Sequence, residues 1–142
     1  MLCSRADFEA VEGFDGRFML GDTKISWMLT AKEIPIRFVP NANVAHHHFG
    51  DFTRLFRERY ARGKEFAEMR VEHFQWDQKR ISKELLKTFF LLRLFSFLRR
   101  GFQNARQAKL GLAYLWVCPV ILVGHAAWLA GELVFYLRHR GN

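Results

Sequence analysis

Cysteine is scarce in this 142-residue sequence, and its first residues lack the features of a sorting signal. The two cysteines, Cys3 at the extreme start and Cys118 in an apolar run, predict no disulfide framework and a reducing compartment. No long apolar stretch follows a basic start, so a signal peptide is not expected. The sequence contains no internal repeat. It also contains no recognised nucleic-acid module, so nucleic-acid binding ranks last among the functions considered.

Acidic residues are nearly absent after position 84, where Glu132 stands alone, and the net charge of +8 is unevenly distributed. Residues 1–50 hold five Lys or Arg and six Asp or Glu, a net charge of −1. Residues 51–111 hold fifteen Lys or Arg and seven Asp or Glu, a net charge of +8. Residues 112–142 hold two basic residues and one acidic residue, a net charge of +1. The basic middle third therefore suits phosphate groups, either of a nucleic acid or of an anionic membrane surface.

Residues 112–137 form one apolar run whose only formal charge is Glu132. A helix of this length exceeds the roughly 20 residues that a bilayer crossing takes, despite Pro119 and His125 inside it. Five basic residues precede the run within about twenty positions, and only Arg138 and Arg140 follow it. The excess of positive charge predicts a single-pass protein of the plasma (inner) membrane with its amino-terminal part in the cytoplasm.

The first fifty residues carry a mixed pattern that predicts an α/β fold. A short helix is expected at residues 5–12 and another at 25–31, with Asp22 or Thr23 as its N-cap. Residues 36–39, between two prolines, and residues 43–46 are expected to be strands.

Two basic amphipathic helices are expected in the middle of the chain. The first covers residues 51–80, with Gly63 as a point of division. The second covers residues 82–100, where Lys87 and Arg93 interrupt an apolar pattern too short to cross a bilayer. This second helix fits either the membrane interface or a buried core, and the sequence leaves both open.

Three ordered motifs lie in the first fifty residues: a glycine turn at 8–18, Gly21-Asp22 followed by an apolar stretch at 25–29, and a strand-like segment at 38–48 that ends in three histidines. In this order and spacing they resemble the carboxy-terminal half of the catalytic domain of family 2 glycosyltransferases. The resemblance covers about residues 1–65. It implies a partial GT-A domain at 1–65. The charge and hydrophobic patterns add basic interfacial helices at 66–111 and a transmembrane helix at 112–137.

The chain departs from the family pattern at several positions. Glu12 stands where a glycine is usual, Gly21 replaces the Glu of an acid pair, and Met28 stands where Arg is frequent. The family's metal-binding Asp-x-Asp motif and its nucleotide-binding half have no counterpart here. The isolated chain is therefore expected to be inactive, as part of a longer enzyme or as a non-catalytic membrane-anchored subunit.

Asp22 is the residue that the resemblance assigns as catalytic base. In an inverting transfer the acceptor hydroxyl loses its proton while it attacks the anomeric carbon, and a carboxylate within about 3 Å can accept that proton. The alternative role of Asp22 is that of an ordinary helix N-cap.

His46 and His48 are the residues that the resemblance places near the donor's diphosphate, where a divalent Mn or Mg ion is implied. The alternative is a polar strand end exposed to solvent, and an isolated zinc site is disfavoured because no further close ligands complete it. Arg59, Arg62 and Trp27 are the candidate contacts for phosphate or acceptor, although a basic helix is more often a solvated face. The expected partners are a nucleotide sugar, an envelope glycan or lipid-linked acceptor, and the membrane.

Overall fold

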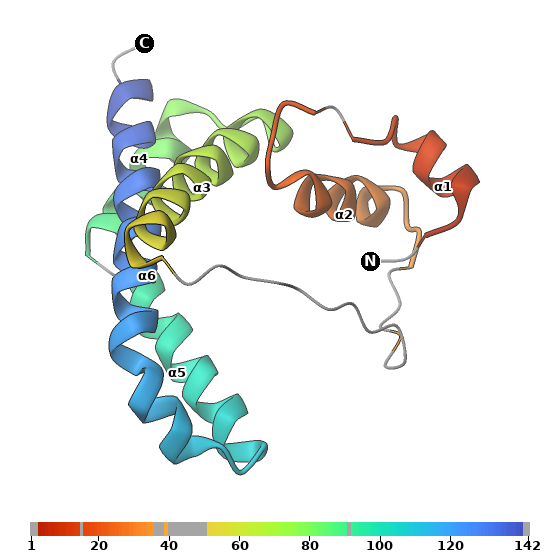
Figure 1. Ribbon diagram of the computed structural model, residues 1–142. Helices are drawn as coiled ribbons and strands as arrows, with labels where there is room; N and C mark the ends of the chain where they lie inside the picture. Colours follow the sequence, from red (N-terminus) through yellow and green to blue (C-terminus); the bar gives the residue numbers. More distant parts are fainter. Residues whose placement is uncertain (1–2, 15, 36–38, 40–50, 91, 141–142) are drawn as a thin grey trace. The chain divides into compact units, whose positions relative to one another are not determined.

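The computed structural model describes residues 3–14, 16–35, 39, 51–90 and 92–140, and within these residues it contains six helices and no strand (Figure 1). The chain divides into two compact units, Met1–Gly50 and Asp51–Asn142. The α/β fold predicted from the sequence is therefore wrong for the described part of the chain, and with it the partial GT-A architecture.

The first unit covers its apolar side chains by packing helix on helix. Helix α1 (Arg5–Ala10) begins after Ser4, whose hydroxyl accepts a hydrogen bond from the amide of Asp7. Helix α2 (Gly21–Ala31) buries Ile25 and Leu29 against Val11, each about 1% exposed. No sheet is needed to bury these side chains.

The predicted strand at 36–39 lies outside the described residues except for Val39, and the one predicted at 43–46 lies wholly outside them. Val39 belongs to no helix and is 44% exposed. Both strand predictions came from β-propensity and flanking prolines. That preference depends on packing against neighbouring strands, which a short sequence pattern cannot supply.

The second unit begins with two helices that aspartates cap. Helix α3 (Phe52–His73) follows Asp51, which accepts from the amide of Thr53 at 2.9 Å, and α4 (Gln78–Phe89) follows Asp77 in the same way. The predicted division at Gly63 is wrong, because α3 continues through it. The break falls at Gln75, whose φ of 48° lies in the left-handed region and ends the helix.

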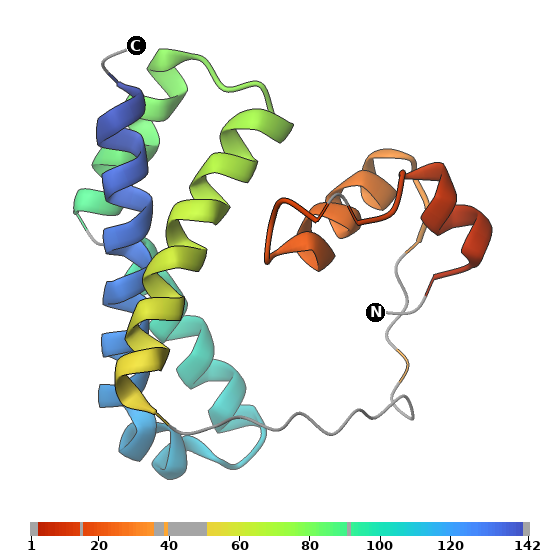
Figure 2. The ribbon, with the colours of Figure 1, turned by 45° about the horizontal axis from the view of Figure 1, so that its top comes forward.

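Helices α5 (Leu92–Gln107) and α6 (Gly111–His139) complete the unit as a hairpin. The continuous helix predicted for residues 112–137 is confirmed, with Pro119 inside it. The helix predicted for 82–100 is instead the end of α4 and the start of α5, with α4 ending at the cap residue Phe90. In Figures 1 and 2, α5 runs antiparallel beside the amino-terminal half of α6, and α3 lies along its other half.

Helices α3 and α6 meet at their backbones. A Cβ added to Gly63 would overlap the carbonyl group of Trp128, and one added to Gly131 would overlap the carbonyl oxygen of Tyr60. On α3, positions 59, 63 and 70 lie against positions 124, 128 and 136 of α6, so the two helices run in the same direction. Small residues permit this close approach, as they do between helices in membranes.

Beyond the glycine contact, a small core joins α3, α4 and α6. Its members are Ala67, Ile81, Leu85, Phe135 and Tyr136, all at most 6% exposed. The carboxy-terminal half of α6 is thus the central helix of this unit.

Gly131→Ala is expected to separate α3 from α6, because its Cβ would meet the backbone of α3, including the amide nitrogen of Lys64 at 2.7 Å. Backbone atoms cannot turn aside as a flexible side chain does. The free energy of unfolding should fall by roughly 2–3 kcal/mol, measured by urea denaturation in mild detergent.

Gly124→Ala is the matched control in the same helix. Its Cβ would meet only the side chain of Arg59, at 3.9 Å, an ordinary contact. This variant should keep its stability or gain up to about 1 kcal/mol from helix propensity. Equal effects of the two substitutions would contradict the observed contact between the helices.

Candidate functional site

Asp22 lies in the first turn of α2, and its carboxylate is exposed. The N-cap residue is Leu20, which makes no side-chain cap, so the prediction of Asp22 or Thr23 as N-cap is wrong. Asp22 instead accepts a hydrogen bond from the amide of Thr23 at 2.8 Å. One carboxylate oxygen is held by this bond, and the side chain remains accessible to an outside hydroxyl.

The turn that follows α1 has a left-handed backbone conformation, which glycine favours. Glu12 has a φ of 60° and Gly13 a φ of 63°, both in the left-handed region. The ring of Phe8 lies against Gly13, and the ring of Phe14 lies against Gly21 at the start of α2. Phe8 and Phe14 contact each other edge to face, with centroids 5.3 Å apart. These two rings fix the turn against the beginning of the helix that carries Asp22.

The histidines assigned to the diphosphate, His46 and His48, lie outside the described residues. Within the described ranges, no three His, Cys, Asp or Glu side chains form a group able to hold a metal ion. Trp27 belongs to α2 in the first unit and is half-buried. In the first unit, the described residues of the predicted site are therefore Asp22 and Trp27 on α2.

Arg59 and Arg62, the predicted phosphate or acceptor contacts, lie on α3 in the second unit. The aliphatic stem of Arg59 packs over Gly124 of α6. Arg62 lies 3.7 Å from the carboxylate of Glu58 on its own helix, and its Nε is buried without a hydrogen-bond partner among the described residues. Both arginine side chains therefore already contact protein groups of the second unit.

A buried charge cluster, which the sequence did not predict, lies where the helices of the second unit meet. Its centre is Glu84 on α4, whose side chain is 2% exposed. Lys87 contacts this carboxylate at 2.8 Å, and Arg70, Arg80 and Arg93 each lie 3.5 Å from it. Four cations therefore surround one carboxylate.

Glu132 is the second carboxylate of the cluster and is also 2% exposed. It pairs with Arg93 of α5 and accepts a hydrogen bond from the indole nitrogen of Trp128 at 2.7 Å. Arg93 thus bridges Glu84 and Glu132, which joins α4, α5 and α6. Arg70 of α3 donates to the hydroxyl of Tyr136 at 3.4 Å and stacks over Trp76, so α3 is tied to the same cluster.

The pKa of Glu84 reflects this environment. Burial pushes it upward, but the hydrogen bond from Lys87 and the charges of Arg70 and Arg93 outweigh burial, so the pKa lies below its ordinary value. A carboxyl with a lowered pKa stabilises the fold above its unfolded pKa. That stabilisation is lost as the pH falls through the folded value.

A signal for this cluster was present in the sequence. Glu132 is the one formal charge in residues 112–137, and Arg93 interrupts an apolar stretch. Lone charges of opposite sign in two apolar helices suggest a pair, because an unpaired charge there is costly. Glu84 gave no such signal, since it lies among other charges on α4.

Comparison with protein-family models, with curated proteins and with solved structures finds no match to the chain. The resemblance to family 2 glycosyltransferases therefore rests on the sequence motifs alone.

Glu84→Gln is expected to lower the free energy of unfolding by roughly 3 kcal/mol at neutral pH, because it removes the carboxylate beside Arg70, which is only 14% exposed, and one of the two carboxylates that Arg93 bridges. The deficit should shrink as the pH falls below the ordinary carboxyl pKa of 4.5, since wild-type Glu84 then loses its charge too. Denaturant unfolding across pH measures both effects.

Glu58→Gln is the control, since it breaks only partly exposed pairs on α3 and should cost less than about 1 kcal/mol. A deficit of Glu84→Gln that does not change with pH would contradict the electrostatic role of the cluster.

Proposed function

We propose that this chain belongs to a membrane-attached inverting glycosyltransferase, which moves a sugar from a nucleotide-sugar donor to an envelope glycan or lipid-linked acceptor. The observation that most supports it is the exposed carboxylate of Asp22 in the first turn of α2, which follows the left-handed turn at Glu12 and Gly13 by nine residues. The proposal depends on these residues and not on the α/β fold, which is wrong for the described part of the chain.

The left-handed backbone at Glu12 adds to this support. Glu12 occupies the position where the resembled family carries glycine, and its φ of 60° is a conformation that costs a non-glycine residue about 1–2 kcal/mol. The chain thus keeps the turn of the resembled family although it has lost the glycine.

In the proposed reaction, the acceptor hydroxyl oxygen forms a bond to the anomeric carbon as the bond from that carbon to the diphosphate breaks. The hydroxyl proton passes to the carboxylate of Asp22, and the nucleoside diphosphate leaves. A bound Mn or Mg ion would neutralise the diphosphate. Its proposed contacts, His46 and His48, lie outside the described residues. Arg59, Arg62 and Trp27 remain proposed phosphate or acceptor contacts.

Attachment to a membrane is supported by α6. Among the described residues it is the one helix long and apolar enough to cross a bilayer, and only 17% of its most apolar 18-residue window is buried. The central helix of a soluble protein would be mostly buried. The plasma membrane, the single crossing and the cytoplasmic side of the amino-terminal part stay predictions from the flanking charges.

A non-catalytic membrane-anchored subunit is the second candidate. Two observations favour it: Gly21 replaces the acidic residue beside Asp22, and Asp22 bonds the amide of the next residue in its own helix. Such a subunit would keep the turn and the anchor without performing transfer.

Asp22→Asn separates the two candidates. It keeps the shape of the side chain and an acceptor for the amide of Thr23, but removes the base. Transfer of radiolabelled sugar from nucleotide-sugar donors to membrane acceptors should fall by at least about 100-fold, measured in membranes that contain the natural protein with this substitution.

Asp7→Asn is the control, a half-buried acid in the first turn of α1 whose loss should leave transfer unchanged. Undiminished transfer by Asp22→Asn would reject Asp22 as the base and favour the non-catalytic subunit. Equal losses in both variants would also reject it.

A further inference from the structure

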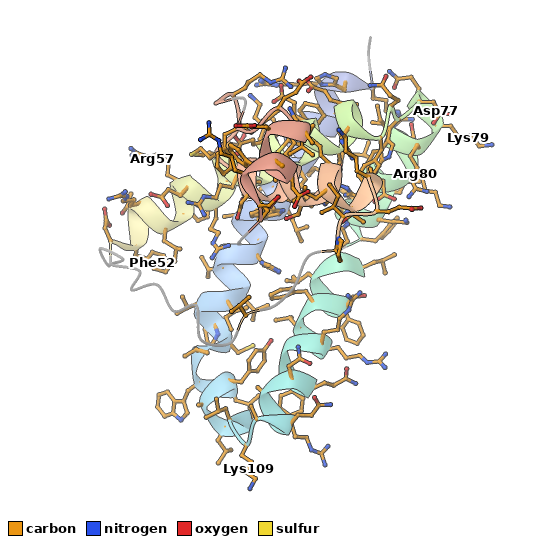
Figure 3. All side chains as sticks on the ribbon, turned by 90° about the vertical axis from the view of Figure 1, so that its right-hand side faces the viewer. Phe52, Arg57, Asp77, Lys79, Arg80 and Lys109 are labelled. Carbon is orange, nitrogen blue, oxygen red and sulfur yellow. The ribbon has the colours of Figure 1, made fainter. Side chains whose placement is uncertain are left out.

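The exposed apolar side chains of the second unit gather in the α5–α6 hairpin, residues 92–123. In α6 they include Leu112 at 80% and Trp116 at 87% exposed, and in α5 Phe95 at 71%. Figure 3 places Lys109 at the tip of this hairpin, at the opposite end of the unit from Asp77, Lys79 and Arg80. The hairpin end of the unit therefore exposes more large apolar side chains than the opposite end, where Phe74 and Leu137 are exposed.

The burial of α6 side chains changes at Gly124. Every buried residue of α6 lies from that position onward: Gly124, Ala127, Leu129, Gly131, Glu132, Phe135 and Tyr136. None lies at 111–123. The two halves of the apolar run therefore have different surroundings, which composition alone does not reveal.

Helix α3 packs along the half of α6 beyond Gly124, and α3 carries too many charged side chains to enter the hydrocarbon core of a bilayer. Ten of the 22 residues of α3 are Arg, Lys or Glu, and its closest contacts with α6 begin at Arg59 and Gly124. Each charged side chain at the centre of a bilayer costs about 2.5–3.5 kcal/mol on insertion scales, so α3 and the half of α6 packed on it stay outside the acyl chains.

The half of α6 left for the membrane is too short to cross it. Residues 111–123 rise about 20 Å at 1.5 Å per residue, whereas the hydrocarbon core is about 30 Å thick. A helix of this length cannot cross the bilayer and stays within one leaflet.

The hairpin also carries charge that complements anionic lipid. Residues 85–131 contain no Asp or Glu and six basic residues, Lys87, Arg93, Arg99, Arg100, Arg106 and Lys109. Arg99, Arg100, Arg106 and Lys109 are exposed. In α5, Phe95 and Phe102 lie on one side of the helix together with Arg99 and Arg106, so that aromatic rings and cations share one exposed face. At a membrane interface such rings enter the acyl chains while the long arginine side chains reach the headgroups.

We infer that the α5–α6 hairpin lies in the interface of one leaflet of an anionic bilayer, with Arg106 and Lys109 at the level of the headgroups, so that both ends of the chain lie on the same side. The exposed aromatic rings contact acyl chains, and Arg99 and Arg100 contact lipid phosphates. This inference rests on the membrane attachment proposed above, and it replaces the single crossing predicted from the sequence.

Counting accessible cysteines on each molecule tests the arrangement. The full chain with Cys118→Ser and Arg140→Cys keeps Cys3 near one end and a thiol near the other. It is reconstituted into vesicles of phosphatidylcholine with phosphatidylglycerol and treated with a membrane-impermeant maleimide. Mass spectrometry should find molecules with two labels or none, whatever their orientation, and two labels on all molecules after detergent is added.

One label on each molecule would show a crossing and overturn the inference, while membrane attachment would stand. A second measurement, binding of the chain to preformed vesicles, tests the lipid contacts separately. Arg99→Ala with Arg100→Ala should weaken binding to the same anionic mixture roughly 30-fold, at about a factor of five for each charge, and should leave binding to phosphatidylcholine alone unchanged.

The matched control is Arg57→Ala with Lys79→Ala, which removes two exposed cations away from the hairpin (Figure 3). Its binding should stay within about threefold of wild type, because interactions of exposed charges are screened beyond roughly 10 Å. Equal losses in the two double variants would overturn the lipid contacts. Failure of the wild-type chain to bind either vesicle would overturn the proposed membrane attachment itself, and the test on Asp22 would be unaffected.

Discussion

The contact between α3 and α6 is the constraint on which the second unit depends. Gly63 and Gly131 allow the two backbones to touch, and this brings a highly charged helix along half of a very apolar one. The cluster of Glu84, Glu132 and Arg93 then joins α4 and α5 to the same surface. Because charges and apolar residues are segregated along α6, one half is a bundle core and the other is left for lipid.

The helices were more predictable than their packing. The hydrophobic pattern located the start of α3 and nearly the whole of α6, because that signal is local. The break at Gln75, the continuous α3 through Gly63 and the split between α4 and α5 were not predicted. A glycine can divide a helix or let another helix approach it, and only the tertiary partner decides between these roles. The α/β prediction failed for the same reason, since strands depend on partners.

The candidate site was predictable only as single residues. Asp22 lies at a helix start, as the motif suggested, although Leu20 is the N-cap. The charge cluster was missed because its members are distant in sequence, from Arg70 to Glu132, and are joined only when four helices pack. An apolar run of 26 residues predicted a bilayer crossing by length. The sequence could not reveal that α3 covers half of it.

The most direct test of this account is an oxygen-accessibility scan of single spin labels along α6, in the full chain bound to anionic vesicles. Labels at residues 112–123 should show high oxygen accessibility on the exposed side, because they lie among acyl chains. Labels at 124–136 should be shielded by α3 and α4 on one side and accessible to water-soluble relaxants on the other. High oxygen accessibility that continues along one side of α6 past residue 131 would contradict the account, because it would show α6 crossing the bilayer without α3.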